Sequence, residues 1–324
     1  MKTFLSILLA LTPSIIHVNI RRLFGQKIGQ KTKLKFGTLI ISNNIQIGKD
    51  SKIGPFTLIK AENLSIGDYT VIKPLVLIKA LTIEIKNYVK ISILNIINSE
   101  LSESSFFSIG DHSSIFPYCW IEPGEGIFIG ENVGIGGHTL MFTHGSWPNY
   151  VEGGPVSFGS ITIENDVWLP WRVFILPNVK IGAGVIVGAN SLINKDIEEC
   201  TLVAGSPAKV IKKIIKQDID KVEKMNVIIE HYAKHIEFKD NITTNKVNND
   251  LWELGKINIS IDKNANTNDL IIFINNPIPK NIDCSYVDYN KKTVYYKRQN
   301  KKEVLDFVGF IRKFGIRLYI QQLN

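Results

Sequence analysis

A histidine lies inside the longest interruption of an otherwise regular sequence pattern. His144 follows Thr143 in a segment, residues 141–160, that breaks a repeat of six residues. An imidazole takes up and releases a proton near neutral pH, so histidine suits general acid–base chemistry. Long insertions in compact repeats usually carry function. We therefore look for the chemistry of this chain at His144.

The pattern around this segment is a repeat whose units open with an aliphatic residue. A fixed short period indicates a solenoid, because each unit buries its apolar row only by stacking on its neighbours. Short strands would alternate inward and outward side chains, with glycine or asparagine at the bends. We expect a mainly β solenoid with three flat faces over residues 28–211. Its clearest units begin at Ile47, Ile53, Ile66, Ile72, Ile109, Ile115, Ile121, Ile129, Ile135, Ile163, Leu169, Ile175, Ile181, Val187 and Ile193.

Residues 1–27 precede the solenoid and are mostly apolar. The run from Phe4 to Leu11 is too short to cross a bilayer as a helix, which needs ~20 residues, and Arg21-Arg22 follows it. We expect an N-terminal apolar helix that either caps the open end of the solenoid or lies on a membrane surface, where the arginines would suit anionic headgroups. A cleaved signal peptide is the alternative, although only Lys2 precedes the apolar run and no clean cleavage site follows it.

The chain after the solenoid changes pattern twice. Apolar residues at helical spacing from Val210 to about Phe238 predict a helix, and the polar residues that follow predict a linker, so that residues 212–250 form a helix and linker. Residues 251–324 mix strand and helix patterns, with a hairpin around Asn290-Lys291-Lys292 and an amphipathic helix from Glu303 to Phe314. We expect a small C-terminal α/β module without a catalytic motif.

Composition and charge narrow the classes of function. The formal net charge is +8 and the sequence pI about 9.2, yet the sequence has no zinc-finger spacing, RNA-binding motif or arginine-rich arm, so we expect no nucleic-acid partner. The charge either belongs to a solvated surface or attracts anionic substrates, cofactors or lipids. Three cysteines without paired spacing fit a reducing compartment. We expect a cytoplasmic protein, peripheral at the inner membrane face if its first helix binds lipid.

The run from Ile109 to Ile211 resembles the hexapeptide-repeat acyltransferases, over about a third of the chain. The resemblance implies a left-handed parallel β-helix, and the weaker units from Ile47 extend it. It rests on Thr143-His144 in a loop leaving the solenoid and on the motifs Ser160-Ile161-Thr162-Ile163, Asp166-Val167-Trp168, Ile175-Leu176-Pro177-Asn178-Val179, Val187-Gly188-Ala189-Asn190-Ser191, Asn194-Lys195-Asp196-Ile197 and Gly205-Ser206-Pro207-Ala208-Lys209.

For function, the resemblance implies an acetyltransferase that uses acetyl-CoA as acyl donor. In the family, a loop histidine takes a proton from a hydroxyl or amine, which then attacks the thioester, and His144 matches this general base. A hydroxyl is a poor nucleophile until it is deprotonated. Lysines near the end of the helix could meet the phosphates of the donor, or could simply be solvated. The positions that match the family's donor groove are Trp171, Ala189, Asn194, Lys195, Lys209 and Lys212.

The resemblance points to O- or N-acetylation of a sugar or polysaccharide precursor, a small-molecule or glycan acceptor that the sequence does not identify further. His138, Trp147 and Tyr150 are candidate acceptor contacts, since aromatic faces stack on sugar rings; the loop aromatics could instead form a hydrophobic plug that holds the loop against the solenoid. Active sites of the family form where the loop of one chain meets the face of another. The resemblance therefore also implies a homotrimer.

Two other functions stay open. The segment Trp168-Leu169-Pro170-Trp171-Arg172 departs from the family, which has a glycine and a small residue after Trp-Ile. A bulky Trp171 beside the thioester could abolish donor binding and leave a non-catalytic β-helix scaffold or binding module. A related β-helix family, the gamma-class carbonic anhydrases, binds zinc through three histidines. His112, His138 and His144 are candidates for such a site, but their spacing does not match, so we expect no metal.

Overall fold

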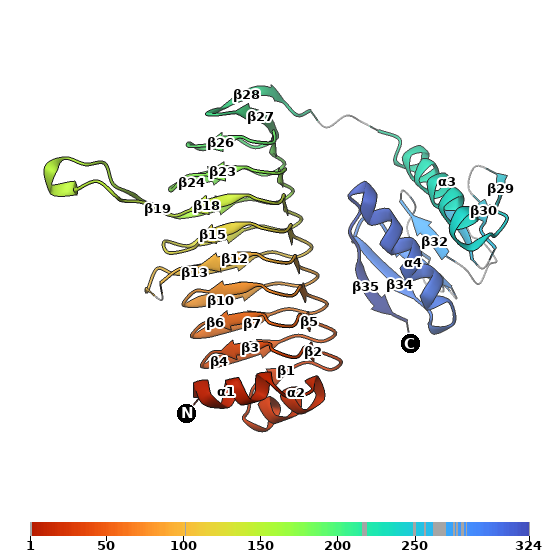
Figure 1. Ribbon diagram of the computed structural model, residues 1–324. Helices are drawn as coiled ribbons and strands as arrows, with labels where there is room; N and C mark the ends of the chain where they lie inside the picture. Colours follow the sequence, from red (N-terminus) through yellow and green to blue (C-terminus); the bar gives the residue numbers. More distant parts are fainter. Residues whose placement is uncertain are drawn as a thin grey trace. The chain divides into compact units, whose positions relative to one another are not determined.

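The computed structural model describes residues 2–100, 102–215, 219–248, 251–255, 257–261, 270–274, 276, 278–279, 282 and 284–323. The chain forms two compact units, Met1–Ile215 and Lys216–Asn324. The first unit is a tall coil of short strands with two helices at its N-terminal end (Figure 1). The expected fold class, a left-handed parallel β-helix solenoid, is confirmed.

Three sheets run along the β-helix. Each complete coil contributes one strand to each of them, and two further strands extend sheet B at its C-terminal end. Sheet A contains β1 (Lys27–Ile28), β4 (Asn44–Ile47), β7 (Asn63–Ile66), β10 (Thr82–Ile85), β13 (Phe106–Ile109), β16 (Ile127–Ile129), β21 (Ile161–Ile163) and β24 (Val179–Ile181). Sheet B contains β2 (Lys33–Leu34), β5 (Lys52–Ile53), β8 (Val71–Ile72), β11 (Lys90–Ile91), β14 (Ser114–Ile115), β17 (Gly134–Ile135), β22 (Trp168–Leu169), β25 (Ile186–Val187), β27 (Thr201–Gly205) and β28 (Ala208–Lys213). Sheet C contains β3 (Leu39–Ile41), β6 (Leu58–Lys60), β9 (Leu77–Lys79), β12 (Ile96–Asn98), β15 (Trp120–Glu122), β18 (Leu140–Phe142), β23 (Phe174–Ile175) and β26 (Leu192–Ile193).

The aliphatic residue that opens each six-residue unit points into the β-helix. Ile47 pairs in register with Ile66, which pairs with Ile85, and Ile85 pairs with Ile109. All four side chains are almost fully buried, and burying one such side chain stabilises a fold by roughly 1.5–3 kcal/mol. The chain turns through three corners per coil, here named the A–B, B–C and C–A corners after the sheets that they join. In-register stacking means that equivalent residues of successive coils lie directly above one another.

The C-terminal end of the β-helix differs from the sequence prediction. The helix predicted from Val210 is wrong up to residue 215: Ala208–Lys213 is strand β28, which pairs antiparallel with β27. The open edge of β27 supplies hydrogen-bond partners that helical periodicity does not reveal. Helix α3 (Lys221–Asp240) begins where Asp220 caps it, its side chain accepting from the backbone N–H groups of Val222 and Glu223. Residues 216–218 of the predicted helix lie outside the described part of the chain.

Two helices, and not the single predicted one, lie against the first coil. Helices α1 (Lys2–Ala10) and α2 (Ser14–Leu23) are separated at Pro13, which precedes the first turn of α2 and cannot continue α1. The backbone N–H of Gly37 donates to the carbonyl of Ala10, and that of Leu34 donates to the Ser14 hydroxyl. Leu34 belongs to β2 and Gly37 to the turn after it, so both contacts provide partners for backbone N–H groups of the first coil. No helix in the described part of the chain is long and apolar enough to cross a membrane.

A buried histidine–arginine pair anchors α2. Arg21 is 2% exposed; its Nε donates to His17 Nε2 over 2.8 Å and its guanidinium also donates to the Ile40 carbonyl over 2.9 Å. Burial, followed by the charge of Arg21, lowers the pKa of His17 to about 4, and burial lowers the pKa of Arg21 to about 10. His17 is therefore neutral at physiological pH, with Nε2 as a hydrogen-bond acceptor.

The second unit is an α/β module. Its seven-stranded sheet runs in sequence order, with helix α4 (Lys301–Ile311) and α3 contributing to one core. The predicted hairpin is confirmed, since β33 and β34 pair antiparallel, and the predicted helix from Glu303 is α4 followed by the 3-10 turn η3 (Arg312–Phe314). The strands are β29 (Asn245–Asn248), β30 (Leu251–Glu253), β31 (Asn258–Ile261), β32 (Leu270–Phe273), β33 (Ser285–Asp288), β34 (Thr293–Tyr296) and β35 (Tyr319–Gln322).

The linker predicted up to Asp250 is wrong in part. Residues Asn245–Asn248 form edge strand β29, which pairs antiparallel with β30. Its four side chains are all exposed, so the strand lacks the alternation of apolar residues by which a half-buried strand is usually found. Residues 249 and 250 lie outside the described part of the chain.

The His17 environment gives a testable pH dependence of stability. The native state resists protonation of His17 down to about pH 4, whereas an unfolded chain takes up this proton near pH 6.5. The unfolded state thus binds more protons between these values, and the free energy of unfolding falls as the pH drops, by up to about 3 kcal/mol. Urea unfolding at pH 7 and pH 4.5 should show a larger loss for the native chain than for His17→Gln, which keeps an acceptor for Arg21. Equal losses would contradict this account.

Candidate active site

The long interruption of the repeat forms an arm at the C–A corner. After β18 the chain leaves the β-helix at Thr143 and returns at Ser160, and the arm projects away from the coils (Figure 1). Strand β19 (His144–Gly145) pairs antiparallel with β20 (Ser157–Phe158), and the 3-10 turn η1 (Tyr150–Glu152) forms its tip. His144 lies at the base of the arm, so the rigid coils fix its position.

Glu122 holds the imidazole of His144. The Oε2 atom of Glu122 lies 2.9 Å from His144 Nδ1. The Thr143 hydroxyl donates to the same carboxylate oxygen over 2.8 Å, and the backbone N–H of Gly124 donates to Oε1 over 2.9 Å. The Glu122 side chain is 13% exposed and that of His144 is 46% exposed. The carboxylate is thus fixed by the protein, while the ring remains open to solvent on its other side.

This contact decides which nitrogen of the ring is free. An ionised carboxylate accepts hydrogen bonds and donates none, so Nδ1 carries the hydrogen when His144 is neutral. The lone pair then lies on Nε2, which faces away from Glu122. When Nε2 takes a proton, the carboxylate stabilises the resulting imidazolium. The arrangement is that of a general base with an orienting carboxylate, the two-member part of a catalytic triad.

The stacking of coils places Glu122 beside the arm. Strands β15 and β18 pair in parallel with Glu122 opposite Phe142, two residues before His144. Sequence reasoning missed Glu122, although a signal was available. Ile121 opens a unit one coil before Met141, so the residue after Ile121 must lie beside the residues that follow Met141. That residue is Glu122, whose carboxylate orients the His144 ring.

The predicted donor-binding residues fall into separate groups within one chain. Trp171 and Ala189 lie at the B–C corner, whereas Asn194 and Lys195 follow β26 at the C–A corner. Asn194, Lys195 and Lys209 line a cavity of about 420 Å³ between the last coil and the hairpin β27–β28. Lys212 lies on β28 and does not line this cavity. Within a single chain, none of these residues is brought to His144 by a hydrogen bond or ring contact in the described structure.

An aromatic stack occupies the B–C corner. The rings of Tyr118 and His138 stack with centroids 5.1 Å apart, and the ring of Trp171 is tilted against His138 at 5.9 Å. Trp171 covers the Cα of Gly137, where any larger side chain would collide with its ring. Trp171 is 46% exposed. The structure therefore places His138 with Trp171, one sheet away from His144.

The aromatic residues of the arm face solvent. The side chain of Trp147 is 96% exposed and that of Tyr150 is 75% exposed, so the alternative that they form a plug against the β-helix is wrong. These apolar side chains are therefore open to contact with another molecule.

The three histidines considered for zinc lie at three different corners. His112 is at the A–B corner, His138 at the B–C corner and His144 at the base of the arm at the C–A corner. The described residues contain no group of three histidine, cysteine or acidic side chains that could hold a metal ion. These histidines do not converge within one chain.

Several known proteins are similar to this chain in sequence. A Saccharomyces cerevisiae protein named as an acetyltransferase is 31% identical over 134 residues, 34% of this chain and 68% of the relative. Chloramphenicol acetyltransferase of Klebsiella aerogenes is 46% identical over 55 residues, 17% of this chain and 26% of the relative. The solved hexapeptide-repeat acetyltransferase VCA0836 of Vibrio cholerae is 30% identical over 40% of this chain and 72% of that chain, with a TM-score of 0.35. No family model matches the chain.

The chain belongs to the hexapeptide-repeat acetyltransferases, as its sequence motifs predicted. It spans between about a quarter and a half of the length of the curated relatives that it matches first.

The tautomer of His144 tests the role of Glu122. We expect ¹⁵N NMR of the native chain to show neutral His144 with hydrogen on Nδ1 and a free Nε2. In Glu122→Ala this preference should be lost, because the acceptor for Nδ1–H is gone. Glu125→Gln, in the same turn, should leave the spectrum unchanged. A native ring with its hydrogen on Nε2 would contradict the assignment.

Proposed function

We propose that this chain is an acetyl-CoA-dependent acetyltransferase that acetylates a hydroxyl or amine of a sugar or polysaccharide precursor. The Glu122–His144 pair, at the base of an arm in this family's β-helix, carries the proposal. The names of the curated relatives support acetyl transfer. The exposed rings of Trp147 and Tyr150 support a sugar acceptor, because aromatic faces stack on the apolar faces of sugars.

The geometry suggests how the reaction proceeds. His144 Nε2 removes the proton from the acceptor hydroxyl or amine as this group attacks the thioester carbon of the acetyl group. The new C–O or C–N bond forms a tetrahedral intermediate, and its collapse breaks the C–S bond. The departing thiolate receives the proton from the His144 imidazolium, which Glu122 stabilises until then. The step is balanced without a metal or further reactant, and general-base help of this kind is worth ~10²–10⁴ in rate.

We propose that the acyl donor lies between the arm of one subunit and the B–C corner of another in a homotrimer. The separation of Trp171 and Ala189 from His144 within one chain supports this arrangement. Two exposed apolar surfaces support it as well: the arm, with Trp147, Val151 and Phe158, and the B–C corner with its neighbouring strands. That second surface is formed by the side chains of Phe116, Tyr118, Trp120, Trp168 and Trp171. Patches of this kind on the same coils are commonly buried between subunits.

Replacing the base tests the reaction. We expect His144→Ala to lower the acetylation rate by ~10²–10⁴, because the acceptor must then attack without general-base assistance. The assay uses radiolabelled acetyl-CoA with the acceptor that a screen of nucleotide sugars identifies. An unchanged rate would remove His144 from the mechanism.

Donor binding is the control for this variant. Coenzyme A should raise the melting temperature of both the native chain and His144→Ala, since ligand bound only to the folded state stabilises it. A native chain that coenzyme A does not stabilise would favour the non-catalytic scaffold, in which the bulk of Trp171 closes the donor site.

The subunit arrangement gives a separate prediction. Light scattering of the purified full chain should report a trimer, and Val151→Asp should shift it toward monomers, because a charge at the arm tip would be buried without a partner. Phe238→Asp places the same change on an equally exposed residue of α3 and should leave the trimer intact. A native monomer that still acetylates its acceptor would overturn the shared site.

A further inference from the structure

Helix α1 presents apolar side chains to the outside. Phe4 and Leu8 of the helix and Leu11 directly after it are exposed, while Leu9 and Ala10 are buried. The helix is thus apolar on both sides, whereas a helix that merely covers a protein core has an apolar stripe inward and polar residues in water. The first coil therefore does not explain why the outer side of α1 is apolar.

Helix α2 also exposes apolar residues. Ile15 and Leu23 are exposed, Leu23 by 85%, while His17 and Arg21 are buried together with Val18. The remaining ionisable residue of the helix, Arg22, is exposed. Phe24, directly after the helix, is exposed as well. The two helices thus form one exposed apolar surface at the N-terminal end of the β-helix, here named the end surface.

The charge of the chain is concentrated at the same end. The first 49 residues contain eight Lys and Arg residues and no Asp or Glu. Subtracting these eight from the 38 basic residues of the chain leaves 30, which equals the number of acidic residues. The formal net charge of +8 therefore belongs entirely to the helices and the first coil and a half, and the rest of the chain is balanced.

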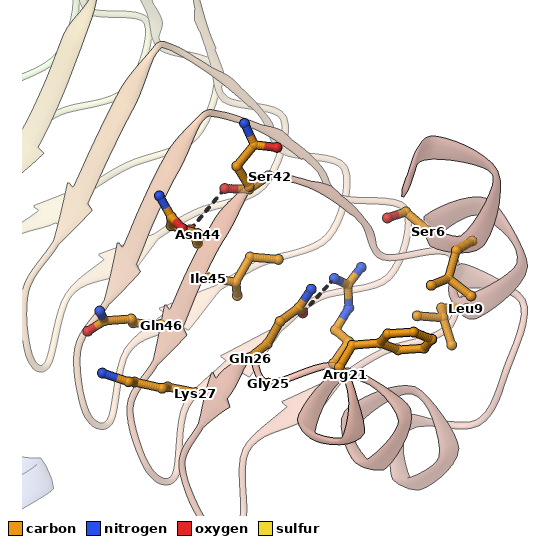
Figure 2. Close-up of a pocket in the computed structure, with 13 residues that line it drawn as sticks. Ser6, Leu9, Arg21, Gly25, Gln26, Lys27, Ser42, Asn44, Ile45 and Gln46 are labelled. Carbon is orange, nitrogen blue, oxygen red and sulfur yellow. Dashed lines mark hydrogen bonds between the residues drawn. The ribbon is translucent and has the colours of Figure 1, made fainter. Parts of the chain in front are cut away.

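A pocket opens beside the end surface. It has a volume of about 430 Å³ and is lined by residues of α1, α2 and the first strands, among them Arg21, Gln26 and Lys27. Figure 2 shows the guanidinium of Arg21 donating a hydrogen bond to Gln26. Across the pocket lie the hydroxyl and amide groups of Ser42, Asn44 and Gln46. No acidic residue lines the pocket, and no carboxylate in the described part of the chain forms an ion pair with Arg21. A nearly buried cation with only neutral partners favours a bound anion.

We propose that the N-terminal end of the β-helix docks on a bilayer that contains anionic phospholipid. The apolar side chains of the end surface enter the boundary between headgroups and acyl chains, and a headgroup phosphate binds the pocket at Arg21 and Lys27. Interfacial helices bind in this way, through buried apolar area and basic residues, without spanning the bilayer. A second copy of the chain fits poorly, because two ends of this charge would repel each other.

The docking is tested by sedimentation of the purified full chain with two kinds of vesicle, one of phosphatidylcholine alone and one with added phosphatidylglycerol. We expect binding to the anionic vesicles that is at least tenfold tighter and that weakens as salt is added. Leu23→Asp should weaken this binding at least tenfold. Lys27→Glu should weaken it about fivefold or more, since each basic residue near a charged bilayer contributes about that factor. Phe238→Asp, an exposed control outside the end surface, should bind as the native chain does.

Any of the following outcomes would overturn the proposal. Equal binding to both vesicles, or none, would remove the anionic bilayer as occupant. A change of oligomeric state in Leu23→Asp, with vesicle binding unaltered, would assign the end surface to a second copy. Thermal stabilisation by inorganic phosphate without vesicle binding would make the pocket a site for a free anion. Circular dichroism confirms that the variants fold, and the test does not depend on acetyl transfer.

Discussion

In-register stacking of the coils is the constraint on which the rest of this structure depends. Ile47, Ile66, Ile85 and Ile109 lie above one another because each parallel strand pairs residue for residue with the next. The same register that fills the core brings Glu122 next to the residues after Met141. The strand register thus places a carboxylate and an imidazole from different coils next to each other. The geometry of the Glu122–His144 pair is a consequence of the repeat, and only the arm departs from that repeat.

Most of the first unit could be predicted from sequence because its information is local. The aliphatic residue that opens each unit, such as Ile163 or Ile181, can be predicted to be buried from its position in the repeat. Glu122 was not predicted as a site residue because its role depends on a partner one coil away. The period of the repeat was nevertheless enough to place the two residues side by side. Strand β28 was not predicted for a related reason. Residues Ala208–Lys213 form a strand because they pair with the open edge of β27, whereas the spacing of their apolar residues is typical of a helix. Strand β29 was not predicted because all its side chains are exposed and its sequence lacks alternating apolar residues.

The chemical groups of the candidate site are distributed over the corners of the β-helix. Within one chain, His144 stands at the C–A corner, while the stack of Tyr118, His138 and Trp171 occupies the B–C corner. The proposed homotrimer would bring such groups together across subunits, because a prism with flat faces packs readily about a threefold axis. Helices α1 and α2 lie at the N-terminal end of the β-helix, several coils away from the arm (Figure 1).

A structure of the chain with bound coenzyme A tests the central claim most directly. The account predicts a trimer in which the thiol of the ligand lies beside Nε2 of His144, with Nδ1 bonded to Glu122 and the B–C corner of a neighbouring subunit, including Trp171, against the ligand. A ligand bound within one chain and far from His144, or an arm that meets no neighbouring subunit, would contradict it.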